Sequence, residues 1–233
     1  MLHKTLAIVL KYIKYRESSI IVKIYTEQFG LQSYIVNGVR SERGKYSIAL
    51  FQPLSILDMV VYHKSKKNTL QRVSEIKVGY PYQNLLYDIK KLSVAIFLSE
   101  VLVKVLREEE GNTDLFQFLR EALIYLDEAP DQFDNFSPQF LLKLSKYLGF
   151  LPTSAQEMFE QLYESNFLQV KPSYFSEEVT LLDTLIRLPF EESITISGKQ
   201  RRDLTDYLLL FYRLHLDDFG EIKSLNILRQ ILA

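Results

Sequence analysis

The sequence has 233 residues, of which 47% are hydrophobic and 24% charged, and its formal net charge is −1. This composition is that of an ordinary folded protein, and the length suits either two moderate domains or one large domain. Because the chain contains no cysteine, disulfides, thiolate catalysis and cysteine-based zinc sites are excluded.

Neither membrane insertion nor export is expected. No stretch approaches the roughly 20 uncharged apolar residues that a membrane-spanning helix requires. The apolar run at the N-terminus is interrupted by Lys11 and Lys14, and no small-residue cleavage site follows it. We therefore expect a cytoplasmic protein.

The near-zero net charge conceals a large difference between two parts of the chain. Residues 1–80 hold 13 Lys and Arg against 5 Asp and Glu, a net of +8, whereas residues 81–233 hold 15 against 24, a net of −9. Such asymmetry is typical of a protein with a basic surface for a polyanion and an acidic body that faces elsewhere. The alternative is a chance partition between two solvated surfaces.

Residues 1–80 have the composition of β-strands. Short runs of β-branched and aromatic residues are separated by turn residues such as Gly30, Asn37 and Gly38. The expected strands are residues 6–15, 19–25, 31–37, 54–62 and 70–75. Five strands in about 75 residues have the size of an OB-fold barrel, with an SH3-like barrel as the structural alternative.

After Pro81, apolar residues recur at helical spacing. A long buried helix is expected over residues 85–106, with further helices over residues 114–126 and 140–148, the last capped by Ser137. Capping-box sequences at residues 154–157 and 197–200 open two more helices. The sequence therefore predicts an α+β chain, with an OB-fold domain at residues 1–80 and an all-α helical domain at residues 81–233.

No set of catalytic residues is recognisable in the sequence. The Gly-x-Ser-x-Gly, P-loop, dinucleotide-binding and His-Glu-x-x-His motifs are absent, and eight glycines leave little material for a phosphate-binding loop. His3, His63 and His215 fall in three unrelated contexts. We therefore expect a protein that is not an enzyme and that needs no metal or cofactor.

The basic residues of the first segment are grouped in expected turns and strand ends, where side chains can converge on one ligand. Tyrosines are interleaved among them: Tyr12, Tyr15, Tyr34, Tyr46 and Tyr62. Grooves that bind single-stranded nucleic acid combine cations for the phosphates with aromatic rings for the bases. The predicted DNA-binding residues are Lys11, Lys14, Arg16, Tyr34, Arg40, Arg43, Lys45, Tyr46, Lys64, Lys66 and Lys67. Each could equally be a barrel-wall or solubility residue, so the hypothesis depends on their grouping.

Several motifs resemble, in their order, those of the RecO family of bacterial recombination mediators. Residues 25–31 (Tyr-Thr-Glu-Gln-Phe-Gly-Leu) and 37–40 (Asn-Gly-Val-Arg) are similar to the family's first hairpin and its Gly-x-Arg loop, and residues 51–54 to its next strand. Residues 147–152 (Tyr-Leu-Gly-Phe-Leu-Pro) are similar to a helix exit of the family, and residues 212–224 to its C-terminal signature. The resemblance spans nearly the whole chain.

The resemblance implies an OB-fold protein that binds single- and double-stranded DNA, anneals complementary strands and helps to load recombinase onto coated single-stranded DNA. It also implies two protein partners, RecR and the acidic C-terminal tail of single-stranded-DNA-binding protein, with the tail docking on the helical domain. The candidate residues for contacting the tail are Lys143, Lys146, Arg201 and Arg202.

This chain departs from the family pattern in one region. Many relatives carry a four-cysteine zinc site after the helix exit, and residues 154–175 of this chain contain no cysteine. No zinc is therefore expected. We expect aromatic residues to fill the vacated space by apolar packing, namely Tyr163, Phe167, Tyr174 and Phe175.

Two other functions are compatible with the sequence. An RNA-binding OB-fold protein would show dependence on the 2′-hydroxyl in a DNA/RNA competition. A protein-interaction adaptor acting through the acidic helical domain would keep its partner after deletion of the barrel.

Overall fold

The computed structural model describes residues 1–41, 44–63, 69–107, 110–129, 133–173, 176–189, 192 and 194–232. The chain divides into two compact units, residues 1–127 and 128–233. Strands give way to helices after residue 80, as expected, but the first unit also includes two helices. Independent domains at residues 1–80 and 81–233 stay a prediction.

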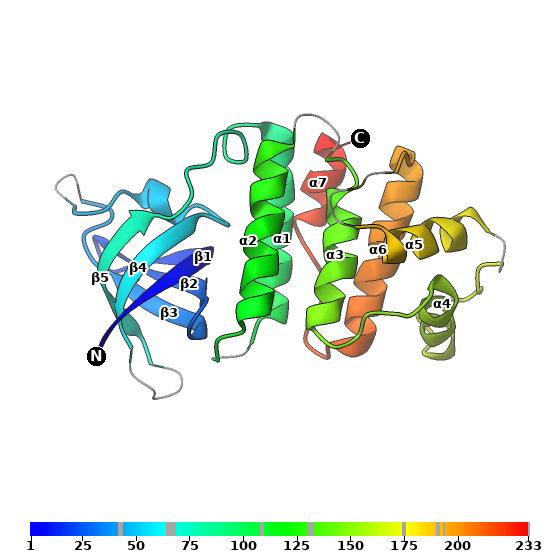
Figure 1. The fold of residues 1–233 in the computed structure, drawn as a ribbon, viewed down its shortest axis with the longest axis horizontal. Coiled ribbons are helices and arrows are strands. Elements are labelled where there is room, and N and C mark those ends of the chain that lie inside the picture. The colour runs from blue at the N-terminus through cyan, green and yellow to red at the C-terminus, as the bar shows by residue number, and fades with distance from the viewer. Residues whose placement is uncertain are drawn as a thin grey trace. The chain divides into compact units, whose positions relative to one another are not determined.

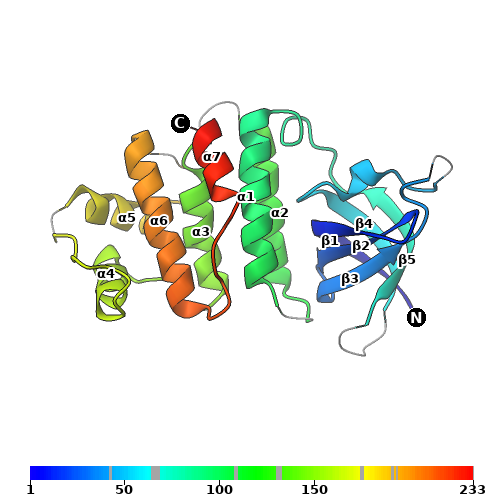
Figure 2. The same ribbon diagram turned by 180° about the vertical axis from the view of Figure 1, so that it is seen from behind.

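The first unit begins with a closed five-stranded barrel (Figure 1 and Figure 2). Its strands are β1 (Leu2–Tyr15), β2 (Ser19–Thr26), β3 (Gly30–Val36), β4 (Ile56–Tyr62) and β5 (Gln71–Val78). They pair in the order β1-β2-β3-β5-β4, with β3 and β5 parallel and the other pairs antiparallel. This arrangement confirms the predicted OB-fold and rejects the SH3-like alternative.

The barrel interior follows the alternation of its strands. Ala7, Val9, Ile24, Met59 and Val61 are almost fully buried there, and a short 3₁₀ helix, η1 (Ile48–Phe51), adds the ring of its last residue to the same core. A β-bulge in β1 falls between Val9 and the lysine two positions later, and shifts the pairing register with β2. The residues that face outward along β1 therefore change at this point.

Two helices of the first unit contact the barrel, α1 (Ile89–Val105) and α2 (Thr113–Glu128). The Ser99 hydroxyl of α1 donates a hydrogen bond to the Leu10 carbonyl of β1. The Phe116 ring of α2 stacks on Tyr25 of β2, with ring centroids 6.3 Å apart. These contacts explain why the compact unit extends beyond the barrel.

A buried carboxylate connects the barrel exit to the end of α2. Asp127 is fully buried and accepts hydrogen bonds from the backbone N–H groups of Gln83, Asn84 and Leu85, at 2.7 Å for the last two. These bonds hold residues 83–85 in a turn. The helix expected from residue 85 therefore begins only at Ile89, where Asp88 caps it.

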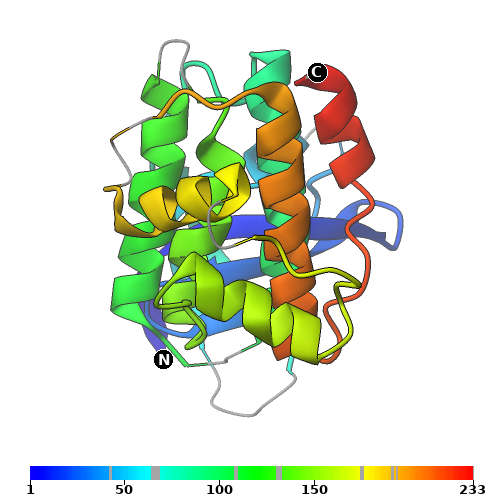
Figure 3. The ribbon, with the colours of Figure 1, turned by 90° about the vertical axis from the view of Figure 1, so that its right-hand side faces the viewer.

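The second unit is a bundle of five helices in the described part of the chain (Figure 3). The helices are α3 (Phe136–Tyr147), α4 (Ala155–Glu164), α5 (Glu177–Arg187), α6 (Gly198–His215) and α7 (Leu225–Ile231). Helix α6 contacts α3, α4 and α5 and is opened by the predicted capping box of Ser197 and Gln200. At α4, Ser154 caps the helix, but the Glu157 carboxylate accepts from Thr153 instead of from the capping residue.

Two expectations for the second unit were wrong. Helix α3 begins at Phe136 after Asn135, so Ser137 lies inside its first turn and is not the cap. Tyr163 and Phe167 are 47% and 36% exposed and therefore do not fill a core; the residues that α4 buries are Ala155, Met158, Phe159 and Leu162. Tyr174 and Phe175 lie outside the described residues.

Candidate nucleic-acid interface and partner pocket

The outer face of β2 and β3 is the surface with which OB-folds commonly bind oligonucleotides, together with the loops that join β1 to β2 and β4 to β5. In this barrel three isoleucines lie side by side across the face, because Ile13 of β1 pairs with Ile21 of β2, which pairs with Ile35 of β3. We call these three residues the isoleucine row. Ile13 is 57% exposed and the other two are half-buried, so the row presents apolar surface to solvent.

A pair of lysines lies on one side of the isoleucine row. Lys11 and Lys23 are direct cross-strand partners on the same face of β1 and β2. Burial, and then the charge of Lys11, lower the pKa of Lys23. Like charges directly opposite each other destabilise a sheet, so an anion bound between them would relieve an existing cost.

Two arginines lie on the other side of the row, at the turn between β1 and β2. The Arg40 backbone N–H donates to the Ser18 carbonyl at 3.1 Å, and its guanidinium donates to the Arg16 carbonyl at 3.2 Å. The Arg16 guanidinium lies over the Tyr15 ring, 5.2 Å from its centroid. The loop after β3 therefore brings Arg40, 24 positions away in sequence, next to Arg16.

The same loop is fastened to β5 farther along. Lys45 Nζ and the Tyr46 hydroxyl both donate to the Ser74 carbonyl, at 3.2 and 3.3 Å, and the Tyr46 hydroxyl accepts from the Ile76 N–H. The loop closes tightly at Gly44, where a Cβ would lie 2.0 Å from the Gly38 carbonyl oxygen. Tyr46 thus holds the loop in place with its hydroxyl, and Lys45 remains exposed above β5.

The structure separates the predicted DNA-binding residues into groups. Lys11, Arg16 and Arg40 border the isoleucine row, and Lys45 lies over β5. Lys14 is exposed near the end of β1, where it pairs with the core residue Ile20 and so faces away from Lys11. Arg43, Lys64, Lys66 and Lys67 lie outside the described residues.

Tyr34 is a correction to the predicted set. Its side chain is fully buried in the barrel core, and this burial raises the pKa of its hydroxyl well above the usual range. A ring inside the barrel cannot stack on a DNA base. Lys23 was missed, since only the strand register shows that it faces Lys11.

The cations around the isoleucine row are not neutralised by the protein itself. Within the described part of the chain, no ion pair is formed by Lys11, Lys23, Arg16 or Arg40. Lys4 of the same strand β1 differs, because its ammonium lies 3.2 Å from a carboxylate oxygen of Asp58. The face is therefore open to phosphate groups on both sides of an apolar row.

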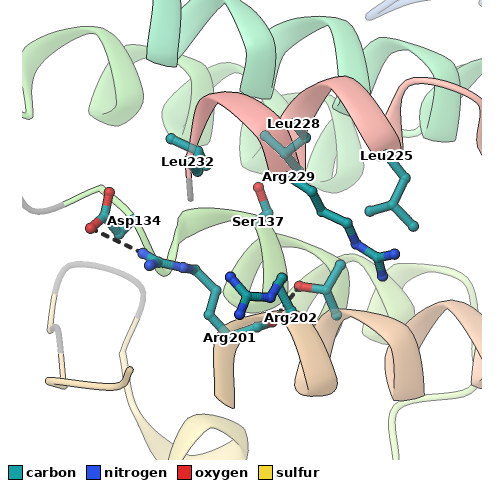
Figure 4. A pocket seen from close by; sticks show the side chains of 9 residues that line it. Asp134, Ser137, Arg201, Arg202, Leu225, Leu228, Arg229 and Leu232 are labelled. Atoms are coloured by element: carbon teal, nitrogen blue, oxygen red, sulfur yellow. Dashed lines mark hydrogen bonds and ion pairs between the residues drawn. The ribbon is translucent and has the colours of Figure 1, made fainter. Parts of the chain in front are cut away.

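The second unit contains a pocket between α3, α6 and α7 (Figure 4). Leucines of α7 form one wall, and arginines surround the opening. The residues that line it are Asp134, Ser137, Arg201, Arg202, Thr205, Leu225, Leu228, Arg229 and Leu232. Of the four predicted partner-binding residues, Arg201 and Arg202 line this pocket.

The pocket combines positive charge with unsatisfied polar groups. Arg201 pairs with Asp134 at 3.0 Å, and Arg229 pairs with Asp206, whereas Arg202 forms no ion pair with any described residue. The Ser137 hydroxyl is buried, at 3% exposure for the residue, and has no hydrogen-bond partner within the described residues. An acidic ligand with an apolar side chain suits this combination.

The other two predicted partner-binding residues lie outside the pocket lining. Lys143 Nζ donates to the Ile186 carbonyl at 3.1 Å, and Lys146 lies over the Tyr147 ring. Sequence reasoning missed Arg229 and Ser137, which come from separate helices and meet only in the folded unit.

Two features are absent from the part of the chain that the structure describes. No helix there is long and apolar enough to cross a membrane. No group of three or more His, Cys, Asp or Glu side chains there could hold a metal ion.

The fold places the chain in the class of OB-barrel proteins that carry an appended helical unit. Residues 1–82 match the family model for "Recombination protein O N terminal", and residues 86–161 match that for "Recombination protein O C terminal". Similar proteins named DNA repair protein RecO occur in Flavobacterium johnsoniae and Flavobacterium psychrophilum, at 40% and 39% identity over 99% of both chains. Another, in Phocaeicola vulgatus, is 35% identical over the full length of both. The chain belongs to the RecO family.

Proposed function

We propose that this protein acts in DNA repair and recombination as a mediator without catalytic turnover. In this role it binds single- and double-stranded DNA, anneals complementary strands and helps to load recombinase onto coated single-stranded DNA. The observation that supports DNA binding most directly is the set of cations on both sides of the isoleucine row that form no ion pair with any described residue. Family membership supports the repair role.

The physical basis of annealing is charge neutralisation. Phosphates of one strand would lie against the lysine pair, Lys11 and Lys23, and against the arginines at the β1–β2 turn, while its bases cover the isoleucine row. A second strand brought to the same basic surface then meets less repulsion from the first. This mechanism requires no acid, base or nucleophile.

RecR and the acidic C-terminal tail of single-stranded-DNA-binding protein are the proposed protein partners. The tail would dock in the pocket of the second unit, where the Arg202 guanidinium forms no ion pair and the buried Ser137 hydroxyl no hydrogen bond with any described residue. The leucines of α7 would cover an apolar side chain of the tail.

Binding to DNA is tested by titrating a labelled oligonucleotide at several salt concentrations. The double variant Arg16→Gln/Arg40→Gln should weaken binding to all sequences and reduce the slope of log K against log salt by about 1 to 2. Lys4→Gln is the matched control, because this lysine is already paired with Asp58. Salt-independent binding, or equal slopes in all three proteins, would contradict the proposal.

Docking of the tail is tested with a fluorescent acidic peptide that ends in a free carboxylate. Arg202→Gln should weaken peptide binding about tenfold, because a charge-assisted hydrogen bond contributes about 1.5–3 kcal/mol. Lys146→Gln, on the same unit but outside the pocket, serves as control. If the two variants bind the peptide with equal affinity, the tail docks at another site.

A further inference from the structure

Most aromatic rings of the barrel are buried or half-buried. Tyr25 and Tyr34 are 1% and 0% exposed, and Tyr12, Tyr15 and Tyr46 are half-buried. Among the described residues of the five strands, Tyr62 is the one aromatic residue classed as exposed, at 47%. A stacking contact on this barrel therefore has one well-exposed candidate.

The register places Tyr62 at the extension of the isoleucine row. Its cross-strand partner in β5 is Arg72, which in turn pairs with Ile35 of β3. Directly opposed residues on a sheet have Cβ atoms about 5 Å apart, so the ring and the guanidinium are neighbours. Beyond Ile35, the isoleucine row is therefore followed by the charged Arg72 on β5 and then by the exposed Tyr62 ring on β4.

Arg72 is available for a phosphate. Its side chain is exposed, and it forms no ion pair with any other described residue. On the far side of Tyr62, its β1 partner Leu2 is 52% exposed and carries no charge. A cation and a ring side by side provide the two contacts that a nucleotide unit offers, a phosphate and a base face.

We propose that Tyr62 stacks on a base and Arg72 binds the adjoining phosphate, and that the Tyr62 ring makes the barrel bind single strands more tightly than duplex. The inference rests on the proposed function, since it extends the DNA-binding surface from β2 and β3 onto β5 and β4 and assigns it a specificity. In a duplex both faces of each base are covered by neighbouring bases, whereas phosphates stay accessible. The lysines and arginines thus bind either form, and only the ring distinguishes them.

The test compares Tyr62→Leu, Tyr62→Phe and Arg72→Gln in the full chain. The control is Tyr87→Leu, because Tyr87 is 81% exposed but belongs to the segment before α1 and not to a strand. Each protein is titrated with a short labelled oligothymidine and with a duplex of equal length. A single 2-aminopurine in the oligonucleotide reports stacking through its fluorescence.

Tyr62→Leu should weaken single-strand binding about tenfold and abolish the fluorescence change on binding, with less than a twofold effect on duplex. Tyr62→Phe should retain both, since it keeps the ring, and Tyr87→Leu should match the parent. Arg72→Gln should weaken binding to both single-stranded and duplex DNA, and should lower the slope of log K against log salt by about 0.7 to 0.9.

Equal loss on single strands and duplex, or no loss for Tyr62→Leu, would overturn the inference. If Tyr62→Leu does not fold, Arg72→Gln still tests the inference. An unchanged salt slope in this variant would show that Arg72 does not contact a phosphate. If the parent protein binds neither the oligothymidine nor the duplex, the proposed function itself fails. The two failures are therefore distinguishable.

Discussion

Replacing Lys23 by glutamine should have opposite effects on stability and on DNA binding. Lys23 and Lys11 oppose each other across β1 and β2, and Lys23 is half-buried. Two ammonium groups about 6 Å apart in water repel each other by about 0.7 kcal/mol. We therefore expect the substitution to raise the free energy of unfolding by about 0.5 kcal/mol at low salt. The gain should fall as salt screens the repulsion.

If the proposed DNA-binding surface is correct, the same substitution also removes a contact to phosphate. The slope of log K against log salt should fall by about 0.9 for duplex and about 0.7 for single strands. Urea denaturation at two salt concentrations measures the stability, and oligonucleotide titration measures the slope. Lys4→Gln should instead lose a little stability, because Lys4 pairs with Asp58, and should leave the slope unchanged.

Either of two results would refute the reasoning about the lysine pair. A clear loss of stability in Lys23→Gln would mean that the two charges are neutralised within the protein. An unchanged salt slope would mean that DNA does not reach this part of the face.

Three further predictions concern the first unit. Asp127→Ala should lower the free energy of unfolding by about 3 kcal/mol in a urea titration, because three backbone N–H groups at residues 83–85 lose a charged acceptor; a loss below about 1 kcal/mol would contradict this. Burial lowers the pKa of His63 below its ordinary 6.5, so the stability from its neutral form is present above pH 6.5 and lost below it. His63→Phe, which keeps the ring contact to Phe29, should flatten the fall in Tm between pH 7 and 5; an unchanged profile would exclude this histidine as its source. Gly111→Ala should destabilise the unit by about 1–3 kcal/mol, since a Cβ would lie 2.5 Å from a backbone oxygen of the β2–β3 turn. Equal Tm values for this variant and the parent protein would show that the turn can move to make room.

Much of the secondary structure could be predicted from the sequence because its signals are local. All five strands occur where β-branched and aromatic runs predicted them, and the Ser197 capping box opens α6. The start of α1 could not be predicted, because Asp127, more than 40 residues later, holds the preceding turn. A tertiary hydrogen bond therefore overrode the apolar periodicity at residues 85 and 86.

The candidate sites were predicted in part. Grouping by charge found Arg16 and Arg40, which the structure brings into contact, and Arg201 and Arg202, which line one pocket. It could not find Lys23, because a lone lysine within a strand gives no signal until the strand register is known. The pocket also depends on α7, which packs beside α3 and α6 only in the folded unit.

The sequence by itself determined the class of fold, the family and the sign of the charge on each segment. Only the tertiary structure decided which tyrosines face outward. In β3, Gln32 and Tyr34 face the interior while Ile35 is half-exposed, so alternation of polar and apolar residues misidentifies the inner face. In β4, a register shift between Val60 and Val61 precedes the exposed Tyr62. A strand's pattern shows which residues share a face, but closure of the barrel and its bulges decide which face meets solvent.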